Sequence, residues 1–169
     1  DGMSPSAQLG AIEAKVRVLI AQARDCLHTV LLPALDRFDI RLVEMDALSP
    51  DETRAMDQFF DREVFPVLTP LAVDPGHPFP YISNLSISLA VALRDPARGG
   101  EHFARVKVPR SMPRWIPIGR PHHFVPLERL IGAHLVSLFP GMEIVGWHTF
   151  KITRYSDLDV PAADEPEDL

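Results

Sequence analysis

The chain has 169 residues, of which 46% are hydrophobic and 24% are charged, a composition typical of a globular protein. Its net charge of −6 argues against a broad nucleic-acid surface, because phosphate backbones bind to clustered lysine and arginine. With no apolar run of roughly 18 residues and no basic leader, we expect neither a membrane span nor a secretory signal. The single cysteine, Cys26, excludes an internal disulfide and suits a reducing cytoplasm.

The first predicted element is a long helix that begins after Ser4 and ends near Leu32. Ser4 is a suitable N-cap, Pro5 fits the first helical position, and Pro33 is expected to end the helix. A stripe of apolar residues recurs at alternating spacings of three and four: Leu9, Ile12, Val16, Leu19, Ala23, Cys26 and Val30. A single helix cannot bury such a stripe, so we expect partner helices or the following domain to cover it.

A short strand is predicted at 40–43, and a second helix follows it. Ser49 and Glu52 form a capping box, and Pro50 occupies the first turn. The apolar face of this helix is expected to comprise Met56, Phe59, Phe60 and Val64. Pro66 should end the helix.

Residues 65–84 then form a connector that contains five prolines. Because proline fixes φ and lacks an amide proton, neither a helix nor a paired central strand should pass through it unbroken. Its many apolar residues indicate an ordered, extended segment rather than a flexible linker. The residues expected to form this structural connector are His77, Pro78, Phe79, Pro80, Tyr81 and Asn84. For His77, anchoring of the loop is favoured over binding of phosphate.

Strict alternation predicts a strand over 85–93, with Leu85, Ile87, Leu89, Val91 and Leu93 on one face. The turn at 94–100 should join it to a strand over 102–108 as an antiparallel hairpin. The remaining predicted elements are short strands at 115–118 and 123–125, a helix from Pro126 to about Leu138, and a last strand from about Glu143 to Arg154.

The mixture of elements predicts an α+β fold with a mixed, mainly antiparallel sheet, preceded by a helical arm. We divide the chain into the arm (1–35), an α+β domain (36–160) and an acidic tail (161–169).

No catalytic or metal-binding residue is predicted. Neighbouring strand residues point to opposite faces, so His122 and His123 should not chelate one ion. His134 lies on an apolar helix face and is expected to be a core or interface histidine, and His148 has no acid or nucleophile partner. The sequence contains neither a nucleophile elbow nor a phosphate-binding P-loop.

A basic stretch offers the one candidate anion surface: Arg105, Lys107, Arg110, Arg114 and Arg120. Within it, Arg105 and Lys107 are the possible anion contacts. An exposed hairpin edge explains the same charges, because edge strands commonly carry lysine and arginine against aggregation.

The string FPVLTPLAVDPGHPFPYISNLS at 65–86 resembles the bacterial polyphosphate kinase family, at the opening of its head (middle) domain. The resemblance extends through FFDREV (59–64), FARVKVP (103–109) and FKITRYSDLD (150–159), and so covers most of the chain from about Ile40. It implies that the chain joins the later helices of the N-terminal domain to most of the head domain.

The family transfers the terminal phosphate of ATP reversibly to polyphosphate through a phosphohistidine, assisted by Mg²⁺. The resemblance places the reacting residues in domains that this sequence does not match, so we expect no bound cofactor and no activity in this chain alone. It implies as partners the remaining domains of a cytoplasmic enzyme and a second copy bound through the head domain. The alternative is a stand-alone module that binds nucleotide or polyanion through 105–120.

Overall fold

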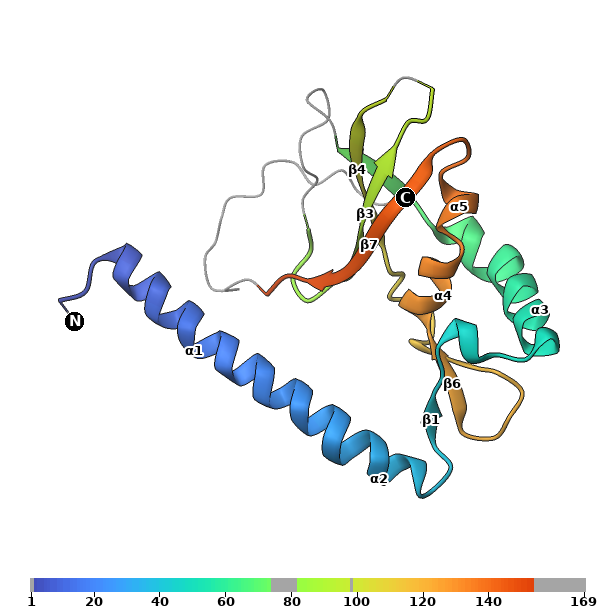
Figure 1. The fold of residues 1–169 in the computed structure, drawn as a ribbon, viewed down its shortest axis with the longest axis horizontal. Helices are drawn as coiled ribbons and strands as arrows, with labels where there is room; N and C mark the ends of the chain where they lie inside the picture. Colours follow the sequence, from blue (N-terminus) through green and yellow to red (C-terminus); the bar gives the residue numbers. More distant parts are fainter. Residues whose placement is uncertain (1, 74–81, 98, 154–169) are drawn as a thin grey trace.

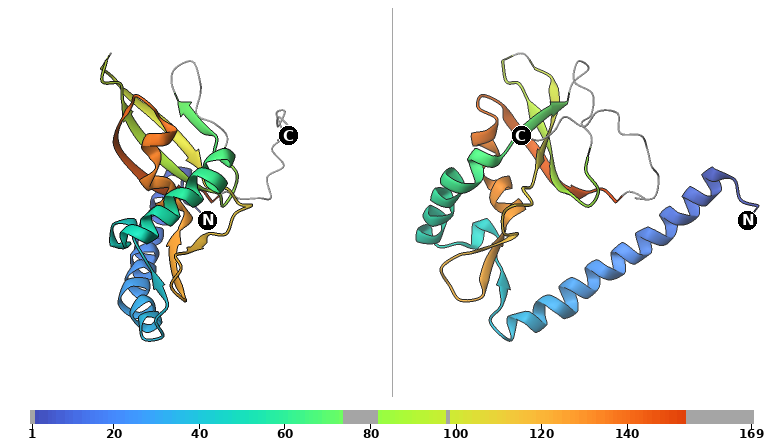
Figure 2. Two further views of the ribbon diagram at one scale, coloured as in Figure 1. Left: turned by 90° about the vertical axis from the view of Figure 1, so that its right-hand side faces the viewer. Right: turned by 180° about the vertical axis from the view of Figure 1, so that it is seen from behind.

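A computed structural model describes residues 2–73, 82–97 and 99–153. It shows a long helical arm followed by an α+β domain (Figure 1), which confirms the predicted fold class. The helices of the domain lie over one face of its larger sheet, and the arm extends away from it (Figure 2).

The arm is one continuous helical rod built from α1 (Pro5–Cys26), a π-helical turn η1 (Leu27–Leu31) and α2 (Leu32–Asp36). Ser4 caps it through a 3.3 Å bond from the Ala7 amide, as predicted. The expectation that Pro33 ends the helix is wrong. The π-turn, in which the Leu32 amide donates to the Leu27 carbonyl, widens the backbone just before Pro33, and the helix continues to Asp36.

The apolar stripe of the arm is exposed along its whole length. Leu9 is 67% exposed and Leu19 is 50% exposed, and no residue of α1 is buried. By length and composition alone, the rod from Pro5 to Asp36 is also long and apolar enough to cross a membrane, a test that helices of soluble proteins also pass. The expected cover of the stripe by the following domain is not found within the described residues.

The second helix begins at the predicted capping box, but Pro66 does not end it, because a 3₁₀ turn continues the helical segment to Val67. It runs through α3 (Pro50–Phe59), a π-turn η3 (Phe60–Val64) and a 3₁₀ turn η4 (Phe65–Val67). Ser49 and Glu52 make both bonds of the capping box, and Pro50 occupies the first turn. Met56, Phe60 and Val64 are buried, whereas Phe59 is half-buried.

The strands among the described residues of the domain form two sheets. The larger has the order β2-β4-β3-β7 with every neighbouring pair antiparallel, and the smaller has the order β1-β6-β5 with β1 parallel to β6. The strands are β1 (Arg41–Leu42), β2 (Pro70–Val73), β3 (Ile87–Arg94), β4 (Glu101–Lys107), β5 (Trp115–Pro117), β6 (His123–Pro126) and β7 (Glu143–Lys151). The predicted hairpin is therefore β3–β4.

One sequence expectation for this region needs correction. Leu85 does not continue the strand face: its φ of 60° places it in a turn before β3, and its side chain is 53% exposed. The connector does contribute a strand, since β2 pairs with β4, but at the sheet edge, where Pro70 opens the strand and lacks only one donor. Asn84 precedes Leu85 in that turn, whereas the connector residues 77–81 lie outside the described residues.

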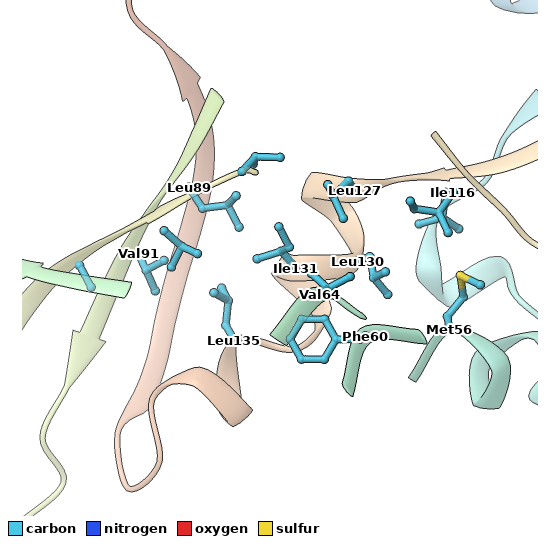
Figure 3. Packing of buried hydrophobic residues seen from close by; sticks show 14 of the residues in the cluster. Met56, Phe60, Val64, Leu89, Val91, Ile116, Leu127, Leu130, Ile131 and Leu135 are labelled. Atoms are coloured by element: carbon cyan, nitrogen blue, oxygen red, sulfur yellow. The ribbon is translucent and has the colours of Figure 1, made fainter. Parts of the chain in front are cut away.

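The core lies between the larger sheet and the helices. Leu89 and Val91 of β3 are fully buried and face α4 (Leu127–Ala133) and α5 (Leu135–Leu138), as Figure 3 shows. Phe60 of η3 closes the other side of α4. The helix predicted from Pro126 breaks at His134 into these two short pieces, but its expected buried face is confirmed at Leu127, Leu130, Ile131 and Leu135.

Helix α4 approaches the sheet most closely at Gly132. A methyl group placed there would overlap the six-membered ring of Trp147 on β7, so only glycine allows the helix to lie at this distance. The guanidinium of Arg129 lies 5.7 Å from the Trp147 ring and covers it from the same helix.

We expect Gly132→Ala to destabilise the domain by about 1–3 kcal/mol, because the added methyl group forces Trp147 or α4 to shift. Chemical denaturation followed by tryptophan fluorescence measures the change. Gly10→Ala is the matched control, since Gly10 is also helical and has open space around its Cα. Equal stability of Gly132→Ala and Gly10→Ala would show that the close approach is not needed.

Candidate functional site

The basic stretch predicted as an anion surface divides into buried, paired and exposed cations. Arg105 points to the face of the larger sheet that lies opposite the helices and is 3% exposed. Its Nε donates to Ser88 Oγ at 3.1 Å, and burial lowers the pKa of the Arg105 guanidinium. Burial separates this cation from ligands outside the domain. Lys107, two residues further along β4, is exposed.

Two other arginines of the stretch have carboxylate partners. Arg114 donates to Glu128 Oε1 at 2.8 Å, and its guanidinium lies 5.4 Å from the Trp115 ring. Arg120 donates to both carboxylate oxygens of Glu52, at 2.6 and 3.3 Å. These pairs could not be predicted from local pattern, because the partners are separated by 14 and 68 residues.

Glu52 joins the capping box to the loop before β6. The Ser49 backbone amide and then the Ser49 hydroxyl hold the pKa of Glu52 below its usual range, and Arg120 acts in the same direction. The carboxylate thus satisfies a helix terminus and an arginine together.

The contacts of His134 and the burial of His122 and His123 show how these histidines are placed in the fold. His134 stacks on Phe60 with ring centroids 4.1 Å apart, its Nδ1 is 2.9 Å from the Leu130 carbonyl, and its Nε2 is 3.0 Å from Asp57 Oδ1. This confirms the expected core role. His123 is buried at the start of β6, and His122, in the turn before it, is exposed.

A hollow of about 730 Å³ lies where the arm meets β1 and β6. Its charged lining includes cations (Arg41, Arg120) and anions (Asp36, Glu44, Asp46), and Arg41 Nε pairs with Asp36 Oδ1 at 2.7 Å. Because the lining carries both signs of charge, it favours neither an anionic nor a cationic ligand. Among the described ranges, no group of three or more His, Cys, Asp or Glu side chains is arranged to hold a metal ion.

Three comparisons with known proteins all find similarity to the same family. The family model "Polyphosphate kinase middle domain" matches residues 51–169. Polyphosphate kinases of Streptomyces coelicolor and Mycobacterium ulcerans are 47% and 45% identical over 99% and 100% of this chain, which spans 22% and 24% of their lengths. The crystal structure of polyphosphate kinase from Porphyromonas gingivalis superposes with a TM-score of 0.77 at 27% identity, over 89% of this chain and 26% of that one.

We expect Ser88→Ala to cost about 1–3 kcal/mol, because it removes a hydrogen-bond acceptor from the buried guanidinium of Arg105. Urea denaturation measures the loss. Ser111→Ala, at an exposed loop position, is the control and should change little. If both variants unfold at the same urea concentration, the Ser88 bond contributes nothing.

The lowered pKa of Glu52 predicts a pH-dependent contribution. Because the folded pKa lies below the unfolded one, ionised Glu52 stabilises the fold at neutral pH, and that stabilisation is lost as the pH falls through the folded pKa. Glu52→Gln should therefore reduce stability at pH 7, and the difference from the unchanged protein should shrink below about pH 4. Denaturation at several pH values measures it, with the exposed Glu63→Gln as control. A loss independent of pH would contradict the ionic role of Glu52.

Proposed function

The chain belongs to the polyphosphate kinase family, and from that premise we propose that it is a structural, non-catalytic part of such an enzyme. The observation that carries the proposal is the match to the middle domain over 51–169, together with the fraction of the relatives that this chain spans, about a quarter. In the whole protein, we propose reversible transfer of the terminal phosphate of ATP to polyphosphate through a phosphohistidine, in the cytoplasm.

The proposed role of this chain is to position other parts of the enzyme. The exposed stripe of the arm supports it, because apolar side chains such as Leu9, Ile12 and Leu19 are stabilised when another surface removes them from water. We assign that surface to the remaining domains of the same protein. A second copy, bound through the α+β domain, is the further partner that we propose.

The reacting groups are proposed to lie in those remaining domains. Each ring nitrogen of His134 lies within hydrogen-bond distance of an oxygen atom, and the ring stacks on Phe60. These contacts support a role of His134 in packing. ATP and Mg²⁺ are proposed for the whole enzyme. Among the described residues, no group of three or more His, Cys, Asp or Glu side chains is placed to hold a metal ion, and we assign no step of the reaction to this chain.

The stand-alone module that binds polyanion through 105–120 receives less support. Arg105 is buried, and Arg120 donates to both carboxylate oxygens of Glu52, so two of the five cations are withdrawn from a ligand. A free module would also leave the arm exposed to water.

The test is ATP-dependent synthesis of polyphosphate by the whole protein, assayed beside this chain alone, with light scattering to measure the mass of each. We expect activity in the whole protein, none in the chain, and a dimer in the whole protein. Phosphohistidine formed on the isolated chain with ATP would overturn the non-catalytic role. An inactive whole protein would overturn the assigned reaction.

A further inference from the structure

One end of the larger sheet gathers the lysines of the domain. β3 begins at this end, and β4 and β7 finish there (Figure 1). Lys107 of β4 lies opposite Ser88, and Lys151 of β7 lies opposite Ile87. Since adjacent strands are about 4.8 Å apart, the two lysine backbones are separated by roughly 10 Å, with β3 between them. Two of the three lysines of the chain (Lys15, Lys107 and Lys151) therefore share this end.

Two arginines reach the same end from the segment that follows β4. Val108 donates its amide to the Ile87 carbonyl at 2.9 Å, and this bond holds the segment against the start of β3. Arg110 donates to the Asn84 carbonyl at 2.5 Å, just before β3. Arg114 lines a hollow of about 200 Å³ together with Lys151 and Thr149. We call Lys107, Arg110, Arg114 and Lys151 the lysine end.

The lysine end has surplus positive charge. Glu128 balances Arg114, but no carboxylate in the described part of the chain forms an ion pair with Lys107, Arg110 or Lys151. The opposite end of the sheet differs, since Arg94 there lies between Glu101 and Glu143, at 3.8 and 3.3 Å. In a chain whose net charge is −6, this surplus reflects placement rather than a generally basic composition.

Contacts with two neighbouring side chains fix the guanidinium of Arg114 at a position where it can also bind a ligand. Glu128 accepts one N–H of its guanidinium, and the Trp115 ring lies 5.4 Å away. An arginine carries five N–H donors in a fixed plane, so this contact leaves several for a phosphate oxygen, and a guanidinium fixed in advance loses less entropy when it binds. The neighbouring hydroxyl of Thr149 adds a further donor at the same hollow.

We propose that the lysine end binds linear inorganic polyphosphate. Lys107 and Lys151 point to opposite faces of the sheet, so the bound chain crosses the sheet end from one face to the other, with one phosphate group in the hollow beside Arg114. A hollow of about 200 Å³ is smaller than the roughly 300–1,000 Å³ of sites that enclose a whole small-molecule ligand, which favours phosphate groups over a nucleotide. This proposal rests on the proposed function and specifies where this domain contacts the polymer.

Titration with long-chain sodium polyphosphate at low salt tests it, read out by calorimetry and by tryptophan fluorescence, to which Trp115 beside Arg114 contributes. We expect Lys107→Gln and Lys151→Gln each to weaken binding about fivefold, as removal of one close charge pair in water predicts. Lys15→Gln is the matched control, because Lys15 is an exposed lysine on the arm, and it should bind as the unchanged chain does. Circular dichroism of each variant checks that the fold is intact.

Added salt should weaken binding further, because phosphates release counterions when they bind cations. ATP, orthophosphate and single-stranded DNA serve as separate arms, and each should bind more weakly than polyphosphate. Equal affinity of the Lys107, Lys151 and Lys15 variants would overturn the site, as would tighter binding of ATP or DNA.

The experiments distinguish a failure of the proposed polyphosphate site from a failure of the proposed reaction. If the whole protein makes polyphosphate from ATP while the lysine variants bind normally, only the site is wrong. If binding depends on Lys107 and Lys151 but the whole protein makes no polyphosphate, the assigned reaction is wrong and the site stands.

Discussion

The fold depends on how closely α4 lies against the larger sheet. Leu89 and Val91 present a flat, fully buried surface on β3, and Gly132 lets the helix approach until its backbone contacts the Trp147 ring. Dispersion attraction falls off steeply with distance, so even a small gap here would weaken many contacts together. Phe60 belongs to the same buried cluster as the apolar residues of α4.

The periodic parts of the fold could be predicted from the sequence, because local pattern decides them. The capping box at Ser49, the hairpin of β3 and β4 and the buried face of α4 all follow from spacing and turn chemistry. Predictions were wrong where the backbone departs from regular geometry. A π-turn accommodates Pro33 inside a helix, and Leu85 takes a positive φ that alternation does not reveal.

The electrostatic part of the candidate site could not be predicted, because it depends on partners distant in sequence. From the sequence alone, nothing tells which of the five cations between 105 and 120 are buried, paired or exposed. In the fold, Arg105 is buried beside Ser88, Arg120 reaches the capping box through Glu52, and Lys107 remains exposed. Lys151, more than thirty residues beyond that stretch, joins it only through the register of β7 with β3. Tertiary pairing, rather than local charge density, determines which cations can meet a ligand.

The arm and the lysine end make different physical demands on the rest of the enzyme. An exposed stripe with residues such as Leu9 and Ile12 is stabilised by any apolar cover, and salt does not screen that stabilisation as it screens an interaction between charges. A cluster of solvated cations gains mainly from a polyanion, and its attraction weakens as the ionic strength rises. The arm therefore suits a permanent contact between domains. The proposed polyphosphate contact at the lysine end is of the second kind, because contacts to a repeating phosphate chain can be exchanged one at a time.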